Sequence, residues 1–226
     1  MWIKTTAVAA AIGMALAMGS VTLQKASSAS SELPAPRKDG SVSVEAALEQ
    51  RRSVRAYSED PVALDVLAQL LWAGQGITGA EGKRTSPSAG ARYPLELYVV
   101  AGNAGELTPG VYHYLPESHR LTQVNDEDVR EALAGAALGQ DPVRQAPAVL
   151  VIAGVYKRTT SRYGDRGIRY VHMEAGHVGQ NIYLQAEACG VRAVSIGAFD
   201  DNAVQRVLGL PKNNVPLYLI PIGLPR

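Results

Sequence analysis

The stretch RGIRYVHMEAGHVGQNIYLQAEAC (166–189) decides the fold. It predicts one long helix, which Gly190 ends as a C-cap. Four of its residues are small enough to permit close approach of neighbouring elements: Ala175, Gly176, Gly179 and Ala186. We therefore expect this helix at the centre of the fold.

Strand and helix signals alternate around this helix. Branched and aromatic residues predict strands over 95–101, 111–114, 191–196 and 215–222. Residues 148–156 (AVLVIAGVY) form a nearly continuous apolar run, as expected for a strand buried on both faces. Helices are predicted over 44–50, 64–76, 126–138 and 201–208. The mix indicates a sheet enclosed by helices and leaves the strand order open.

Length and composition fit one compact domain. A chain of 226 residues with 46% hydrophobic and 19% charged residues can bury a substantial core. Its formal net charge of +1 argues against bulk attraction to nucleic acid. The single cysteine, Cys189, excludes an intramolecular disulfide and cannot build a thiolate zinc site alone. His172 and His177 fall on different faces of the predicted helix, so no metal site is expected.

The first thirty residues differ from the rest of the chain. Lys4 supplies a short positive start, residues 7–21 are apolar, and small residues follow. This layout predicts a signal peptide over residues 1–29 and export to the periplasm or the cell exterior. The alternative is an uncleaved N-terminal anchor, because the apolar run has a marginal length for spanning a membrane. Residues 30–43 are predicted to be a linker before the folded domain, 44–226, in which no membrane span is expected.

An arginine-rich segment, RRSVR (51–55), follows the first predicted helix. Three guanidiniums and a hydroxyl within five residues can hold a phosphate, because each guanidinium presents a rigid fork of donors to anionic oxygens. The alternative is a solvated basic turn, which such charge runs usually are.

Further segments combine bare backbone with amide donors. In PSAGARYP (87–94), prolines stiffen both ends and the small residues 89–91 leave the main chain open to a flat ligand. Gly197, after the predicted strand 191–196, again suggests close approach by something flat. Asn181 needs hydrogen-bond partners, which are either a ligand or a neighbouring backbone. Taken singly, an ordinary structural role explains the loop equally well and explains Asn181 and Gly197 better.

Taken together and in this order, the segments resemble the nitroreductase family, and most closely its SagB-type dehydrogenase branch. The resemblance covers residues 49–226 and is carried by RRSVRAY (51–57), LAQLLWAGQGIT (67–78), RTSPSAGARYPLELYVV (84–100), GVYHY (110–114), RYGDRGIRYVHMEAGHVGQNIYLQAEACGV (162–191), IGAFDD (196–201) and LYLIPIG (217–223). It implies an α+β, nitroreductase-like fold with a central, mainly antiparallel sheet flanked by helices. It also implies a homodimer with flavin sites at the subunit interface.

The resemblance implies that Arg51, Ser53 and Arg55 hold FMN through its phosphate, ribityl chain and ring edge. Arg52 is adjacent to them and is a candidate helper. Arg226 is a further candidate for the phosphate, although family chains often carry a basic residue closer to the final glycine.

Other implied contacts surround the flavin ring. The loop expected to cover the ring from the partner subunit contributes Pro87, Ser88, Ala89 and Gly90. Asn181 matches a position that faces the flavin pocket. The strand end beneath the ring, close to its reactive nitrogen, contributes Ile196, Gly197 and Ala198.

The implied activity is that of an FMN-dependent oxidoreductase, which passes hydride or electrons from a reduced donor to a small organic acceptor or to oxygen. NAD(P)H is one such donor, although export would separate the protein from it. Members implicated in azoline oxidation, within peptide-modifying systems, carry a Lys-Tyr pair where this chain has Arg162-Tyr163. Arginine does not exchange a proton at working pH, whereas a lysine can, so azoline oxidation is kept only as an alternative activity. Tyr163 is a candidate acid near the ring. A non-catalytic flavin-binding scaffold is the other alternative.

Overall fold

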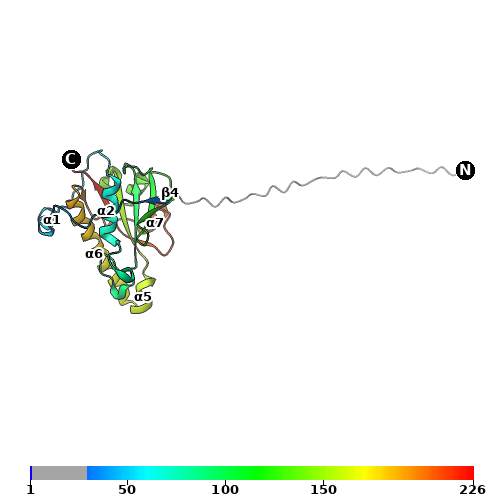
Figure 1. The fold of residues 1–226 in the computed structure, drawn as a ribbon. Helices are drawn as coiled ribbons and strands as arrows, with labels where there is room; N and C mark the ends of the chain where they lie inside the picture. Colours follow the sequence, from blue (N-terminus) through cyan, green and yellow to red (C-terminus); the bar gives the residue numbers. More distant parts are fainter. Residues whose placement is uncertain (2–29) are drawn as a thin grey trace.

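The computed structural model describes Met1 and residues 30–226 (Figure 1). The expected signal peptide, residues 1–29, lies outside the described residues except for Met1. Within these described residues, seven strands form one sheet in the order β1-β4-β3-β2-β5-β7-β6, and each neighbouring pair is antiparallel. The expected α+β architecture is therefore confirmed, and the strand order that the sequence left open is defined.

The strands are β1 (Ser30–Glu32), β2 (Leu95–Ala101), β3 (Gly110–Leu115), β4 (Arg120–Asn125), β5 (Ala148–Gly154), β6 (Arg192–Ala193) and β7 (Val215–Gly223). The helices are α1 (Val44–Gln50), α2 (Leu64–Gln75), α3 (Arg130–Ala136), α4 (Asp141–Gln145), α5 (Lys157–Tyr163), α6 (Arg166–Ala188) and α7 (Asp201–Val207). Two short 3-10 turns, η1 (Ala80–Gly82) and η2 (Ala89–Ala91), lie between α2 and β2.

The central strands are buried on both faces, because helices cover the sheet from two sides. Successive side chains of a strand point to opposite faces. In β2, Leu97 and Val99 belong to the core beneath α2 and α6, whereas Tyr98 and Val100 belong to the core beneath α3, α4 and α7. All seven residues of β5 are buried, which confirms the expectation drawn from its apolar run.

The long helix α6 packs against α2 and against strands β2, β5 and β7, as Figure 1 shows for the two helices. Gly74 of α2 makes this packing possible: a Cβ there would lie 3.0 Å from Leu97 Cδ1 and 3.3 Å from Val178 Cγ1. Of the four small residues that marked this helix, three are buried and Gly176 is exposed. Within residues 30–226, no helix is both long and apolar enough to cross a membrane.

Some elements differ from the sequence-based expectations. The segment predicted to be a linker begins with β1, which pairs with β4 and is followed by the buried Leu33. The helix expected over 126–138 begins only at Arg130, and strand β6 has two residues rather than six. Strand β4 and helices α4 and α5 were not expected at all. Their sequences are short and polar, so they carry little periodic apolar signal.

Candidate functional site

Residues 51–57 run beside the end of the sheet and are held by their backbone. The Val54 N–H donates to the Ala193 carbonyl at 3.0 Å, and Ser53 forms a parallel bridge with Ala193. Tyr57 is 1% exposed, and its hydroxyl donates to the carbonyls of Val54 (2.7 Å) and Pro221 (3.1 Å). Burial raises the pKa of Tyr57 well above its ordinary value, so this hydroxyl remains a donor.

The guanidiniums of this segment are left without acidic partners. Arg51 lies 5.1 Å from the ring centroid of Tyr183, and Arg52 donates to the carbonyls of Glu49 and Arg51, both at 2.8 Å. Within residues 30–226, no salt bridge involves Arg51, Arg52 or Arg55. Arg51 and the exposed Arg55 therefore keep a positive charge that an anion can neutralise.

Tyr183 of α6 joins this segment to the strand end after β6. Its hydroxyl accepts the Ser195 N–H at 2.6 Å and lies 3.3 Å from Ser53 Oγ. Ile196 exchanges two backbone hydrogen bonds with Leu219 of β7, at 2.8 and 3.0 Å. We call Arg51, Ser53, Arg55, Tyr183 and residues 195–198 the arginine cluster.

Arg226, outside the arginine cluster, and residues 197–198 within it make further contacts. Arg226 Nε donates to the Tyr57 carbonyl at 2.8 Å, which places the C-terminal residue beside the arginine-rich segment. The Ala198 carbonyl accepts from Gln140 Nε2 at 2.8 Å. Among the described residues, a Cβ at Gly197 would meet only the ring of Tyr218, at 3.7 Å, so the space beside this glycine is largely open.

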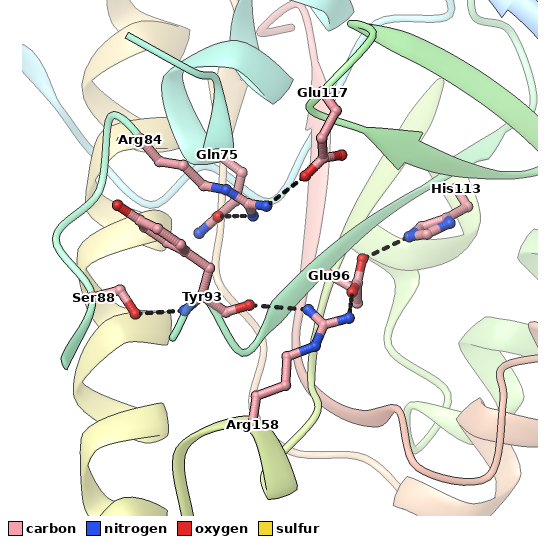
Figure 2. Close-up of polar contacts among 8 residues, drawn as sticks. All are labelled: Gln75, Arg84, Ser88, Tyr93, Glu96, His113, Glu117 and Arg158. Atoms are coloured by element: carbon pink, nitrogen blue, oxygen red, sulfur yellow. Dashed lines mark hydrogen bonds and ion pairs between the residues drawn. The ribbon is translucent and has the colours of Figure 1, made fainter. Parts of the chain in front are cut away.

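The loop between α2 and β2, residues 84–94, is held by side chains (Figure 2) as well as by backbone hydrogen bonds at both of its ends. Arg84 donates to Gln75 Oε1 at 2.7 Å and to Glu117 Oε1 at 3.0 Å. At the other end, Ser88 Oγ accepts the Tyr93 N–H at 2.8 Å, and Arg158 donates to the Tyr93 carbonyl at 3.0 Å.

Arg158 is fixed in turn by Glu96 of β2, which also binds His113 Nε2 at 2.8 Å (Figure 2). Burial alone would raise the pKa of Glu96, but the hydrogen bonds and charges of His113 and Arg158 together hold it below its ordinary value. The carboxylate therefore stays ionised at neutral pH and anchors the loop through Arg158.

The loop stores backbone strain. Gly90, Ala91 and Tyr93 have φ angles of +58°, +52° and +44°, in the left-handed region that favours glycine. Such conformations cost about 1–3 kcal/mol each in residues other than glycine and cluster at ligand sites. The contacts around Ser88 and Arg158 are therefore positioned to maintain a loop shape that the chain would not adopt alone.

Tyr163, the expected acid, lies beside this loop. A Cβ at Gly90 would lie 2.5 Å from the Tyr163 hydroxyl and 3.2 Å from Arg162 Nη1. The ring of Tyr163 meets that of Tyr170 edge to face, with centroids 5.2 Å apart. We call residues 87–90, Tyr163, Tyr170 and Glu174 the loop cluster.

Asn181 links helix α6 to the base of the loop. Its Nδ2 donates to the Ala73 carbonyl at 3.1 Å and to Ser86 Oγ at 3.0 Å. The partners of this amide nitrogen are thus neighbouring protein groups, one of the two alternatives left open by the sequence. Within residues 30–226, no hydrogen bond connects the arginine cluster directly to the loop cluster.

Two cavities lie along α6. The larger, of about 520 Å³, is lined by residues 37–44 and by side chains of α2 and α6 that include Trp72 and Asn181. The smaller, of about 260 Å³, lies between the loop and α6 and is lined by Pro87, Ser88, Ala89, Tyr170, Met173, Glu174 and His177. In the described part of the chain, no group of three His, Cys, Asp or Glu side chains could hold a metal ion.

Sequence reasoning missed Glu174 and Tyr183. Glu174 had a signal, since it lies between Val171 and Val178 on the apolar side of α6, where a carboxylate is unusual. Tyr183 gave no comparable signal, because a partly buried tyrosine on a helix is ordinary.

Comparison with known proteins agrees with this architecture. Residues 48–224 match the model of the nitroreductase family. A protein of Methanocaldococcus jannaschii that bears the name of a nitroreductase is 48% identical over 182 residues, which are 80% of this chain and 91% of the relative. The microcin B17-processing protein McbC of Escherichia coli is 28% identical over 61% of this chain and 53% of its own length.

Among solved structures, a crystal structure from Ralstonia eutropha that carries the nitroreductase name superposes with a TM-score of 0.76. It is 28% identical and covers 87% of this chain and 90% of its own. The family match spans more than half of the chain, and the superposed structure shares its fold over most of its length. The chain therefore belongs to the nitroreductase family and is an oxidoreductase.

Proposed function

We propose that the protein is an FMN-dependent oxidoreductase, and that the arginine cluster holds the flavin phosphate. The observation that carries the proposal is that Arg51 and Arg55 have no carboxylate partner within residues 30–226, while the backbone of their segment is fixed by other contacts. Guanidiniums with free charge on a fixed backbone suit a phosphate, because binding requires little rearrangement of the main chain.

The residues present fit the cofactor. Arg51, Ser53 and Arg55 would bind the phosphate and the ribityl chain, and the open main chain at Gly197 would lie against the ring. Bound FMN would supply the hydride and electron transfer. The chain's own residues would orient it, exclude water from it and stabilise the negative charge that it gains on reduction.

We propose that two copies form the complete site. The arginine cluster and the loop cluster occupy separate places along α6, and no hydrogen bond joins them within the described residues. In a homodimer, the loop residues Pro87, Ser88, Ala89 and Gly90 of one protomer would cover the ring held by the other. The Tyr163 hydroxyl beside Gly90 would then be a proton donor to a small-molecule substrate.

The test is the visible spectrum and FMN affinity of the purified full chain and of three variants. Arg51→Ala and Arg55→Ala should each weaken FMN binding about tenfold or more, because each removes a charge-assisted contact of about 1.5–3 kcal/mol. Arg52→Ala is the matched control, since Arg52 donates to backbone carbonyls, and it should change affinity about twofold at most. A chain that takes up no FMN, or equal losses in all three variants, would overturn the assignment.

Azoline oxidation is the second candidate, and the similarity to McbC favours it. Against it stands Arg162, whose guanidinium lies over the Tyr163 ring at 5.5 Å and does not exchange protons at neutral pH. Arg162→Lys should enable azoline oxidation if Arg162 is the missing feature. Turnover of an azoline peptide by the wild-type protein would make this candidate the primary one.

We further propose that residues 1–29 direct export and that the electron donor is consequently something other than NAD(P)H. The proposal depends on the apolar stretch and on the small residues that follow it. The mass of the protein recovered from the periplasm and from the cytoplasm tests it. A protein of uncleaved mass confined to the cytoplasm would contradict export, and rapid turnover with NADH would contradict the donor assignment.

A further inference from the structure

Glu174 is the buried carboxyl group of the loop cluster. It lies on α6 and is 3% exposed, and one of its carboxylate oxygens is buried without a hydrogen-bond partner among the described residues. It lines the smaller cavity together with Ser88. A buried carboxylate lacking one of its partners is costly to maintain in a fold, so its position calls for an explanation.

The surroundings of Glu174 allow both of its protonation states near neutral pH. Burial raises the pKa of Glu174 to about 7, and the Ser88 hydrogen bond and the charge of Arg84 partly oppose that increase. Tyr170 and His177 of the same helix also line the cavity. Arg162 and Tyr163 of α5 are charged and titratable groups at Gly90 of the same loop.

Ser88 and Glu174 line the same cavity, and the hydroxyl of Ser88 also belongs to the loop. Ser88 Oγ accepts the Tyr93 N–H at 2.8 Å, and a hydroxyl offers one donor and two acceptor positions. When Glu174 is ionised, its carboxylate can accept the only hydrogen of Ser88. When Glu174 is neutral, its O–H can occupy the second acceptor position of Ser88, and the Ser88 hydrogen is then free to point elsewhere.

We propose that Glu174 is a positioning residue whose proton decides whether Ser88 donates its hydrogen to Glu174 or to the ligand beneath the loop. The inference rests on the proposed function, in which that ligand is FMN. A hydrogen donated to the flavin stabilises the negative charge of the reduced form. Reduction of the flavin is therefore coupled to proton uptake by Glu174, with no change in the contacts that hold the loop.

The first test is the reduction potential of FMN bound to the full chain, measured from about pH 5.5 to 8.5. Uptake of one extra proton with two electrons adds a pH dependence of up to about 30 mV per pH unit, which is tenfold in the equilibrium constant. The wild-type protein should show this extra dependence near neutral pH. Glu174→Gln should lack it, because the amide keeps a donor for Ser88 and cannot titrate. Ser88→Ala should also lack it, because the link is removed.

The second test needs no flavin. Carbon-13 NMR of the side-chain carboxyls should show one that titrates near pH 7 in the flavin-free protein and is absent in Glu174→Gln. Ser88→Ala should move this titration to higher pH, because the ionised form loses a hydrogen bond.

The outcomes separate the two hypotheses. A Glu174 carboxyl that titrates at its ordinary value, or a Glu174→Gln variant that keeps the full pH dependence of the potential, overturns the inference even if FMN binds. A protein that shows the titration but binds no FMN overturns the proposed function, and with it the role of Glu174 at the flavin, while the coupling to Ser88 stands.

Discussion

The arginine-rich segment 51–57 and the loop 84–94 both contain arginines, but they use them in opposite ways. In the loop, Arg84 reaches Glu117, and Arg158 from α5 binds Glu96, so these guanidiniums act as anchors (Figure 2). In segment 51–57, backbone hydrogen bonds and Tyr57 do the anchoring, and Arg51 and Arg55 lack acidic partners within residues 30–226. The partners of an arginine, rather than its place in a basic run, therefore distinguish an anchor from a ligand contact.

The largest loss of stability is expected when the carboxylate that anchors the loop is removed. Glu96→Ala leaves Arg158 and His113 without their carboxylate and should lower the free energy of unfolding by about 2 kcal/mol. The loss should be smaller than for a fully buried pair, because the Arg158 side chain is 40% exposed. Urea denaturation measures it. The matched control is Glu117→Ala, whose side chain is 68% exposed and whose loss should be about 0.5 kcal/mol; equal losses would contradict the assignment of Glu96 as the main anchor.

The same anchor should weaken in acid. Because the folded state lowers the pKa of Glu96 beneath 4.5, its ionisation stabilises the fold above pH 4.5, and this contribution disappears as the pH falls through the lowered value. The difference in unfolding free energy between wild type and Glu96→Ala should therefore be full at neutral pH and shrink in acid. A difference that stays constant from pH 7 down to about pH 3 would show that the charge of Glu96 contributes nothing.

An effect of similar size is expected from the strained turn of the loop. Gly90→Ala combines a left-handed φ of +58° with a Cβ placed 2.5 Å from the Tyr163 hydroxyl. Gly82→Ala is the matched control, because Gly82 has a φ of +71° and nothing within 4 Å of its Cβ position. The strain alone should cost about 1 kcal/mol in both, and displacement of Tyr163 should add about 1 kcal/mol in Gly90→Ala only. Equal melting temperatures would place Tyr163 away from the loop.

In the arginine-rich segment 51–57, Tyr57→Phe removes a hydroxyl that donates to two carbonyls. The loss should be about 1 kcal/mol in the free energy of unfolding, the ordinary contribution of one donor. FMN affinity should fall as well, because the backbone that carries Arg55 loosens. Tyr98→Phe is a suitable control, since Tyr98 lies in the same core but its hydroxyl accepts from Asn214 rather than bonding to segment 51–57. Equal falls in FMN affinity would contradict a local role for Tyr57.

Much of the fold could be predicted from the sequence because the central elements bury apolar residues at regular spacing. The run AVLVIAG in β5 and the small residues of α6 identify the buried strand and the central helix. Strand β4 and helix α5 escaped prediction because each buries a single residue, Leu121 and Thr159 respectively. Such elements owe their positions to neighbours rather than to a pattern of their own.

The candidate site likewise contains residues that the sequence predicts and residues that it does not. Arg51, Ser53 and Arg55 could be identified because they lie within five residues of one another. The anchor pair Arg158 and Glu96 could not, because the two are 62 residues apart and meet only when α5 packs beside β2. Side chains that act through distant partners leave no spacing to recognise.

The smallest expected effect concerns Arg226, which combines the role of an anchor with that of a candidate ligand contact. Its Nε donates to the Tyr57 carbonyl, so one end of this guanidinium already anchors segment 51–57 while its terminal nitrogens are candidates for the phosphate. Arg226→Ala should lower the free energy of unfolding by less than about 1 kcal/mol, since the residue is exposed. Arg226→Lys keeps the charge but loses the fork, and therefore separates the two roles. If Arg226 reaches the phosphate, the lysine variant should keep most of the FMN affinity that the alanine variant loses. If Arg226 only anchors the segment, both variants should lose the same small amount of FMN affinity. The salt dependence of FMN binding should then match that of the wild type.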